Sequence, residues 1–216
     1  TGRSRPFHRA ADGLVPAQGA AVVLLKRLDR ALADGDRVRA VIRGVGLSND
    51  GRGRGLLVPS QPGQVRALRA AYAAAGVAPS TIGLVECHAT GTPVGDAVEA
   101  RGLAEVFAGC ADVPVGSLKS NLGHLITAAG AAALIKVVGA LEAGERPPTL
   151  HAEHPIAELA AGPLRVLTAA EPWPARAPRR AAISSFGFGG NNAHLIVDAW
   201  EPAAVAPRVV VPAAVA

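Results

Sequence analysis

The residues best suited to chemistry are two histidines, His88 and His124, in the segments VECHATGTPVGD and VGSLKSNLGH. The second segment also carries Lys119, and a third segment, SSFGFGGNNAH, is rich in glycine. Imidazoles, an ammonium group and exposed backbone amides can together stabilise negative charge on the oxygen of an acyl thioester. A serine or cysteine in a strand-to-helix turn is missing from the chain. The sequence therefore predicts one part of an acyl-transfer site, without its nucleophile.

His88 is expected at the carboxyl end of a buried strand, because an apolar run gives way there to the turn-forming ATGTP. Open α/β sheets place their sites in the loops at such strand ends. Thr90 and Thr92 add hydroxyl groups that can hydrogen-bond an amide-bearing ligand. The alternative for this segment is a structural histidine that caps its own turn.

His124 is predicted in the first turn of a long apolar helix, Leu122–Glu142. The helix dipole there disfavours the imidazolium, and a neutral ring can donate a hydrogen bond from Nε2 if Nδ1 is an acceptor. Lys119, Ser120 and Asn121 precede it and complete a polar cluster. The alternative is a helix-capping Asn121 beside an incidental histidine.

Gly187, Gly189 and Gly190 free the backbone of the third segment to approach a ligand closely. The exposed amides of such a turn can form half of an oxyanion hole. A dinucleotide-binding loop is disfavoured, because no βαβ unit follows the glycines. Ser184 and Ser185 lie nearby, but no GxSxG turn surrounds them, so neither is predicted as a nucleophile.

Neither of the two cysteines is predicted to be catalytic. Cys87 adjoins His88, but consecutive side chains of a strand point to opposite faces, so the thiol and the imidazole should face apart. Cys110 lies in a loop with no base nearby in the sequence. The two cysteines form neither a disulfide framework nor a zinc pattern, which favours a reducing cytoplasm and predicts no metal site.

The elements that position these segments alternate between strands and helices. Strands are expected over Ala20–Leu25, Val38–Gly46, Ile82–Cys87, Val113–Ser117, Ala181–Phe186 and His194–Ala199, and helices over Leu28–Ala33, Gln64–Ala75, Asp96–Phe107 and Leu122–Glu142, with a connection over Arg146–Pro178. This alternation predicts a mainly parallel sheet with both faces covered. Since the helix Leu122–Glu142 has little polar surface, it should be buried all round, between this sheet and a second sheet supplied from elsewhere.

Composition disfavours several other classes of protein. No uncharged apolar run reaches the length of about 18 residues that a spanning helix needs, since Thr127–Ile135 ends at Lys136. The net charge is +5, but the arginines are scattered, which argues against nucleic-acid binding. They form either ordinary solvated surface or a docking face for an acidic carrier protein. The chain has no methionine, so excision from a longer polypeptide is expected.

Five segments, taken in order, resemble the C-terminal half of a β-ketoacyl synthase of the thiolase superfamily, and most nearly the ketosynthase domain of type I polyketide synthases. The segments are RPFHRAADGLVPAQGAAVVLLKRL, VIRGVGLSNDGRGRGLLVPS, VECHATGTPVGDAVEA, VGSLKSNLGHLITAAGAAALIK and ISSFGFGGNNAHLIV. The resemblance implies the C-terminal half of an αβαβα layered α/β fold, with a mainly parallel sheet and a buried central helix. It divides the chain into the end of the N-terminal half (1–36), the C-terminal half (37–199) and a Pro/Ala-rich linker (200–216).

The resemblance also implies an activity, the decarboxylative Claisen condensation of an acyl chain with a malonyl-type extender. Both substrates would be carried on phosphopantetheine of an acyl carrier protein, and no cofactor would be bound directly. The two histidines would flank the thioester carbonyl of the extender, and the lysine would support them. The positions that match family motifs are His88, His124 and Lys119 for catalysis, Phe188 and Gly189 for the oxyanion hole and gate, Thr90 and Thr92 for the phosphopantetheine arm, and Asn121 and Asn192 as supporting residues.

Partners follow from the same resemblance. The nucleophilic cysteine of the family lies upstream, in a DTACSS-like turn that this chain lacks. We therefore expect an N-terminal half that carries it, an acyl carrier protein and a homodimer of the complete domain, in the cytoplasm, with no nucleic acid and no membrane. Two departures from the family pattern are Ala89 in place of Gly and Gln18 in place of Glu. The alternative function is a non-catalytic partner subunit or dimerisation module.

Overall fold

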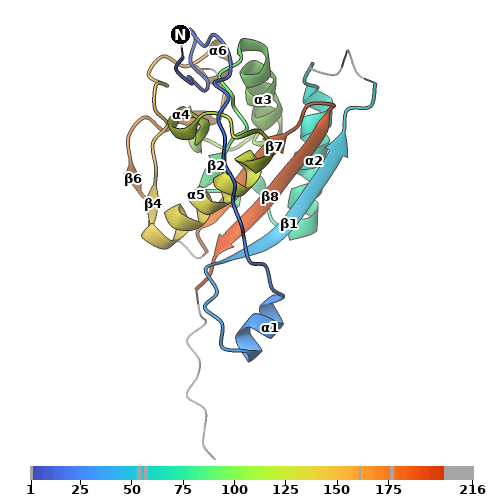
Figure 1. Cartoon of the computed structure of the whole chain (residues 1–216), viewed down its shortest axis with the longest axis vertical. Helices are drawn as coiled ribbons and strands as arrows, with labels where there is room; N and C mark the ends of the chain where they lie inside the picture. The colour runs from blue at the N-terminus through green and yellow to red at the C-terminus, as the bar shows by residue number, and fades with distance from the viewer. Residues whose placement is uncertain (1, 53–54, 56–57, 161, 176–177, 202–216) are drawn as a thin grey trace, which may run out of the picture.

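The computed structural model describes residues 2–52, 55, 58–160, 162–175 and 178–201, so most of the predicted linker 200–216 lies outside the described residues. Its centre is a six-stranded sheet with the order β1-β8-β7-β2-β3-β5 (Figure 1). The strands are β1 (Ala40–Asn49), β2 (Leu84–Glu86), β3 (Val113–Gly116), β5 (Leu164–Val166), β7 (Arg180–Phe186) and β8 (Asn191–Ala199). β2 is parallel to β7 and β3, and β3 to β5, whereas β8 is antiparallel to β1 and β7. The sheet is thus mixed and mostly parallel.

Helices lie on both faces of this sheet (Figure 1). The long ones are α2 (Gln61–Ala75), α3 (Pro93–Val106) and α5 (Ala129–Ala143); the short ones are α1 (Leu28–Ala33), α4 (Lys119–Leu122), α6 (Ala157–Ala160) and the 3-10 turns η1 (Pro79–Thr81) and η2 (Ile126–Ala128). The helix α2 begins at Ser60, whose side chain accepts the N–H of Gly63, and ends at Gly76, which has a φ of 64°. Local capping residues therefore set its two ends.

Successive residues of the central strands enter two different cores, because side chains alternate along a strand. Val85 and Ile196 belong to the core that includes residues of α2 and α3. Leu84 and Val197, their neighbours in sequence, pack with Val137 of α5. Both faces of the sheet are therefore covered by helices of this chain.

The strand β1 lies unusually close to α2. A Cβ atom at Gly46 would collide with the backbone of Ala67 and Ala71, and one at Gly44 with the backbone of Ala71 and Ala75. Two glycines on the helix-facing side of the strand therefore allow the helix to pack directly on the sheet.

The prediction of a strand over Ala20–Leu25 is wrong for the described structure, in which this segment has no strand assignment. It is extended and leads to α1, which lies apart from the sheet (Figure 1). Val22 and Leu24 are 94% and 95% exposed. An apolar run forms a strand only where a neighbouring strand completes its hydrogen bonds, and none of the described strands pairs with this one.

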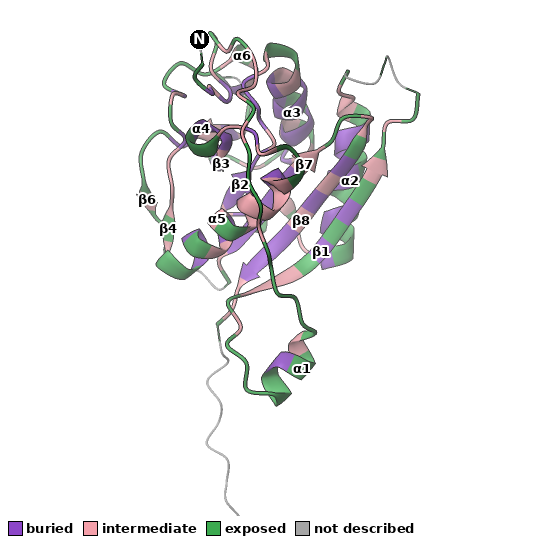
Figure 2. Cartoon of the chain, viewed as in Figure 1, coloured by how far each residue is buried: buried purple, intermediate pink, exposed green. Residues whose placement is uncertain are grey.

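The predicted helix Leu122–Glu142 is divided into α4, η2 and α5. Gly123 ends α4 with a φ of 72°, which interrupts the helical hydrogen bonds. In this chain one side of α5 is exposed: Ile135 is 51% exposed, and Figure 2 shows exposed and intermediate residues on the helix. This is the side that the predicted second sheet, supplied from elsewhere, would cover. One described window, Ile126–Ala143, is long and apolar enough to cross a membrane by length and composition, with 28% of it buried.

The predicted connection Arg146–Pro178 contains regular structure. β5 is one of the two edge strands of the main sheet, and the two-residue strands β4 (Glu145–Arg146) and β6 (Glu171–Pro172) pair into a second, small sheet. These strands have two or three residues each, too few for an alternating pattern to appear in the sequence.

Candidate active site

The two histidines line one cleft of about 680 Å³. Their ring centroids lie 5.3 Å apart, and the ring planes are inclined by 82°. His88 follows β2 and His124 follows β3, and these neighbouring strands run parallel. The carboxyl ends of parallel neighbours share one edge of the sheet, so residues distant in sequence meet there.

The main chain of His124 is held by the N-terminal segment. Its N–H donates to the carbonyl of Val15 at 2.7 Å, and its own carbonyl accepts the N–H of Ala17 at 3.0 Å. The ring nitrogen Nδ1 accepts the N–H of Ile126 at 3.1 Å. A neutral ring with an accepting Nδ1 carries its proton on Nε2, so Nε2 is the donor available to a ligand.

The position of His124 differs from the prediction. It lies between α4 and η2, not in the first turn of the long helix, because Gly123 ends α4 before it. The dipole of the long helix is therefore not what lowers the pKa of His124. Burial, and then the charge of Lys119, lower the pKa of His124.

His88 is partly buried, with its ring 5.7 Å from that of Phe186. Its Nδ1 is buried and has no hydrogen-bond partner among the described residues. Burial lowers the pKa of His88 well below its usual value, and the charges of Lys119 and His124 lower it further. Both rings are thus kept neutral at neutral pH and can act as hydrogen-bond donors.

Lys119 is the buried cation of the site. Lys119 is only 5% exposed, and its Nζ lies 3.5 Å from the carbonyl oxygen of Cys87, the residue before His88. Burial lowers the pKa of Lys119, and Glu86 and Glu99 oppose that shift. The structure therefore brings both histidines and the predicted lysine together.

Two buried carboxyl groups, Glu99 and Asp96, support the loop that carries His88. The oxygens of Glu99 accept the N–H of His88 at 2.8 Å and that of the next residue at 2.7 Å. Asp96 accepts the N–H of Phe7 at 2.7 Å and that of Thr90 at 3.0 Å. Burial raises the pKa of Glu99 to about 8 and the pKa of Asp96 to about 6.

Neither of these carboxyl groups was predicted from the sequence to belong to the site. The signal was their spacing, since residues three apart on a helix lie on one face and α3 directly follows the histidine loop. A pair of acidic residues on the apolar face of a helix indicates buried hydrogen bonds.

The other predicted ligand-binding residues have different surroundings. Thr90 and Thr92 line the cleft, and their hydroxyl oxygens lie 3.0 Å apart. Phe188 also lines it and is 60% exposed. Gly189 lines an adjoining hollow with Asp50 instead. The Gly-rich turn that carries both residues joins the antiparallel strands β7 and β8, so the two predicted strands and the turn between them form a β-hairpin.

The two asparagines predicted as supporting residues differ. Asn192 is buried, and its Nδ2 donates to Asp50 Oδ1 at 2.7 Å and to the carbonyl of Gly190 at 3.1 Å. It thereby joins the end of β1 to the hairpin beside the cleft. Asn121 is exposed, accepts a hydrogen bond from Ser120 at 2.8 Å and does not line the cleft.

Neither cysteine has the surroundings of a nucleophile. Cys87 is fully buried, and burial raises its pKa well above the usual value, which keeps the thiol protonated. Cys110 lines a separate pocket with Arg146 and Arg165. Within the described part of the chain, no group of three or more His, Cys, Asp or Glu side chains is arranged to hold a metal ion.

Comparison with known families gives two matches along the chain. Residues 39–153 match the model of the β-ketoacyl synthase C-terminal domain, and residues 153–213 match that of the ketoacyl-synthetase C-terminal extension. The chain is 48% identical over 203 residues to the phthioceranic/hydroxyphthioceranic acid synthase of Mycobacterium tuberculosis, covering 92% of the chain and 10% of the relative. It is 46% identical over 203 residues to the mycocerosic acid synthase-like polyketide synthase of Mycolicibacterium smegmatis, covering 92% and 10%.

Solved structures agree with these relatives. The chain is similar to an oxazolomycin ketosynthase domain of Streptomyces albus, with a TM-score of 0.90 and 43% identity over 95% of this chain and 38% of that one. It is also similar to the ketosynthase from module 6 of the bacillaene synthase of Bacillus subtilis, with a TM-score of 0.89 and 37% identity over 93% and 38%. The predicted α/β fold class is confirmed. The chain spans about a tenth of the length of the curated relatives and under two-fifths of these solved chains.

Proposed function

The chain belongs to the β-ketoacyl synthase family, as a C-terminal ketosynthase domain of a type I polyketide synthase, and we propose that it supplies the decarboxylating half of a condensation site. In that reaction a malonyl-type thioester loses CO2, and the resulting carbanion attacks the carbonyl carbon of an acyl thioester on a cysteine. A C–C bond forms, the C–S bond breaks, and the cysteine leaves as its thiolate. The cysteine comes from an N-terminal half that is not part of this chain.

The observation that carries this proposal is the convergence of His88 and His124 on one cleft, with ring centroids 5.3 Å apart. Loss of CO2 transfers negative charge to the thioester oxygen, and two neutral imidazoles aimed at that oxygen lower the barrier. Low pKa values suit both rings to this role, because each then donates without a charge of its own. The charge of the buried Lys119 helps to lower the pKa values of both histidines.

The substrate arm enters beside Thr90 and Thr92 in this proposal. Their hydroxyl groups line the same cleft and suit the amides of a phosphopantetheine chain. Phe188 lies at the exposed rim, where the hairpin amides suit an oxyanion hole. Both thioesters come on acyl carrier proteins, which suits the net charge of +5 of this chain, and no cofactor is required.

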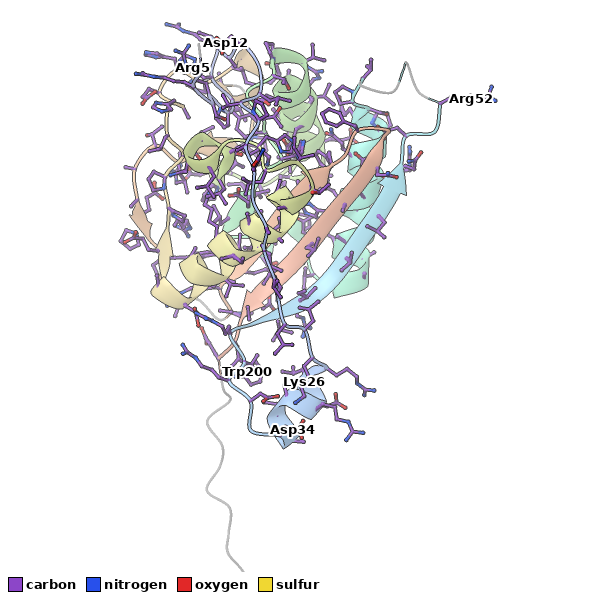
Figure 3. The ribbon with its side chains drawn as sticks, in the orientation of Figure 1. Arg5, Asp12, Lys26, Asp34, Arg52 and Trp200 are labelled. Carbon is purple, nitrogen blue, oxygen red and sulfur yellow. The ribbon has the colours of Figure 1, made fainter. Side chains whose placement is uncertain are left out.

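The N-terminal half covers the apolar surface that this chain leaves open. Val22, Leu24 and Leu25 of the extended segment and Ile135 of α5 are between 51% and 95% exposed. Figure 3 labels Lys26 and Asp34 on the arm formed by this segment and α1, joined by an ion pair of 2.5 Å. Extended backbone with apolar side chains suits the edge of a second sheet. Family membership further supports a homodimer of the complete domain, in the cytoplasm, as part of this proposal.

The test is to purify this chain together with the N-terminal half of a related ketosynthase and to measure CO2 release from malonyl carrier protein. We expect decarboxylation by the wild-type pair. His88→Ala or His124→Ala should lower kcat about 10²- to 10³-fold, as loss of one oxyanion donor does. The matched control is His154→Ala, since His154 is exposed and outside the cleft, and it should leave kcat unchanged.

A folded pair without decarboxylation contradicts the proposal. That result favours the second candidate, a non-catalytic partner subunit or dimerisation module, which needs the fold but not the histidines.

A further inference from the structure

Glu86 is a fully buried carboxylate that the proposed reaction does not use. It ends β2, two residues before His88, and its side chain is 0% exposed. Oε1 accepts the N–H of Leu118 at 2.6 Å, and Oε2 accepts a hydrogen bond from Lys136 Nζ at 2.6 Å. One side chain thereby connects β2, the start of α4 and α5.

Leu118 is the N-cap residue directly before α4, and its side chain makes no capping hydrogen bond. The first N–H groups of a helix have no partner within it, so Glu86 satisfies one of them from a neighbouring strand. Lys119 is the next residue along the chain. The position of the Leu118 amide therefore determines where the backbone of Lys119 begins.

A second contact connects the same two strand ends. Lys119 Nζ lies 3.5 Å from the carbonyl of Cys87, the residue between Glu86 and His88. Ser117, which precedes Leu118, donates from its hydroxyl to the carbonyl of Ala89 at 2.8 Å. The hydrogen bond from Leu118 to Glu86 is thus the first of three contacts that align the end of β2 with the residues after β3.

Lys136, on α5, completes the arrangement. Its side chain is 9% exposed, and it pairs with Glu86 Oε2 while Oε1 stays free for the Leu118 amide. A buried carboxylate without such a partner is strongly destabilising. The contact with the ammonium group of Lys136 therefore holds the Glu86 carboxylate in place beside the site.

We propose that Glu86, held by Lys136, is a positioning residue for Lys119: its hydrogen bond to the Leu118 amide places the amine of Lys119 beside the histidine pair. The role rests on the proposed function, because it matters for catalysis only if the histidines act on a thioester. Burial lowers the pKa of Lys119, and Glu86 is the largest influence in the opposite direction.

The experiment uses this chain in complex with an N-terminal half and compares two double variants. Glu86→Gln/Lys136→Met keeps an acceptor oxygen for the Leu118 amide, whereas Glu86→Met/Lys136→Met removes it; neither leaves a buried charge unpaired. The matched control is Arg180→Met/Asp198→Met, which removes another buried ion pair, with Nε 2.5 Å from Oδ1. That pair joins β7 to β8 outside the cleft.

We expect Glu86→Met/Lys136→Met to lower kcat for decarboxylation about 10- to 100-fold, the size of effect that a small misplacement of a catalytic group produces. KM for malonyl carrier protein should stay within about twofold, because the arm-binding residues are untouched. The other two double variants should stay within about threefold of wild type in kcat. Wild-type kcat in Glu86→Met/Lys136→Met overturns the proposal. So does an equal loss of kcat in Glu86→Gln/Lys136→Met or in the Arg180→Met/Asp198→Met control.

A second measurement does not depend on activity. Exchange of the imidazole C2 hydrogen, followed by mass spectrometry, gives the pH midpoints of His88 and His124 in the complex. The groups that surround the Lys119 amine are Glu86, Cys87, His88, Asp96, Glu99 and His124. Both double variants remove the same two charges, so the comparison between them isolates the position of Lys119. If Lys119 moves away, its charge no longer lowers the two histidine midpoints, so both midpoints should be higher in Glu86→Met/Lys136→Met than in Glu86→Gln/Lys136→Met.

This measurement separates the two proposals. A wild-type complex without decarboxylation contradicts the proposed function, while the exchange midpoints still decide the positioning role; unchanged midpoints overturn it. If Glu86→Met/Lys136→Met does not fold, Leu118→Pro removes the same hydrogen bond from the donor side. Leu118 has a φ of −59°, which proline adopts, and proline has no N–H. The same rise in the midpoints is expected, and its absence overturns the proposal.

Discussion

Replacing Glu99 by glutamine tests how a buried carboxyl group holds the histidine loop. Its oxygens accept the N–H of His88 at 2.8 Å and that of Ala89 at 2.7 Å. Glutamine has the same shape, but its amide nitrogen has no lone pair, so one buried N–H loses its acceptor and faces a second donor. At a pH near 4.5, where Glu99 is protonated in the folded protein, we expect the free energy of unfolding to fall by about 2–3 kcal/mol, since an unsatisfied buried group costs about 1–3 kcal/mol.

Urea unfolding followed by the fluorescence of Trp173, which is 4% exposed, measures this change. The matched control is Glu105→Gln on the same helix. Glu105 pairs with Arg69 at 2.9 Å, with side chains 43% and 64% exposed, and such a pair contributes under about 1 kcal/mol. If Glu99→Gln and Glu105→Gln unfold at the same urea concentration, the reasoning about the carboxyl oxygens is refuted.

The pH dependence of the same variant tests the protonation of Glu99. Burial raises the pKa of Glu99 from 4.5 to about 8, while the N–H of His88 and the charge of Lys119 act in the opposite direction. Between these pH values the folded protein binds more protons than the unfolded chain, so stability falls as pH rises, by up to about 1.4 kcal/mol per pH unit. Glu99→Gln lacks this titration, so the difference in unfolding free energy between wild type and Glu99→Gln should become smaller as the pH rises through this range. A difference that becomes larger contradicts a raised pKa of Glu99.

Two further predictions concern packing and acid unfolding. Gly46→Ala places a methyl group against the backbone of Ala67 and Ala71, so the free energy of unfolding should fall by about 3 kcal/mol, whereas Gly139→Ala, in open space on α5, should raise it by about 0.5–1 kcal/mol. Thermal unfolding measures both, and an unchanged Tm for Gly46→Ala excludes the close contact. Burial lowers the pKa of His194 from 6.5 to about 3, so wild-type stability should fall by up to about 1.4 kcal/mol per unit as pH drops through this window, and His194→Phe should lose that dependence. Identical acid-unfolding curves for the two proteins contradict this prediction.

The local pattern of residues was enough to predict the strand ends, the hairpin and the residues of the site that lie on them. An apolar run followed by ATGTP predicts His88 just after β2, and the glycines of the third segment predict the turn between β7 and β8. Turn-forming residues and strand alternation act over a few positions, so they can be read from one stretch of chain. The same locality made the α/β class predictable from the alternation of elements.

Contacts between distant segments depended on the folded chain. The run Ala20–Leu25 has strand composition but no strand neighbour among the described residues, so it stays extended and exposed. The carboxyl group of Glu86 accepts the N–H of Leu118, and that of Glu99 accepts the N–H of His88. Each carboxyl group thereby supports a residue outside its own strand or helix. A pattern in one dimension shows that a polar side chain lies among apolar ones, but the partner that makes its burial stable is chosen only when strands and helices pack.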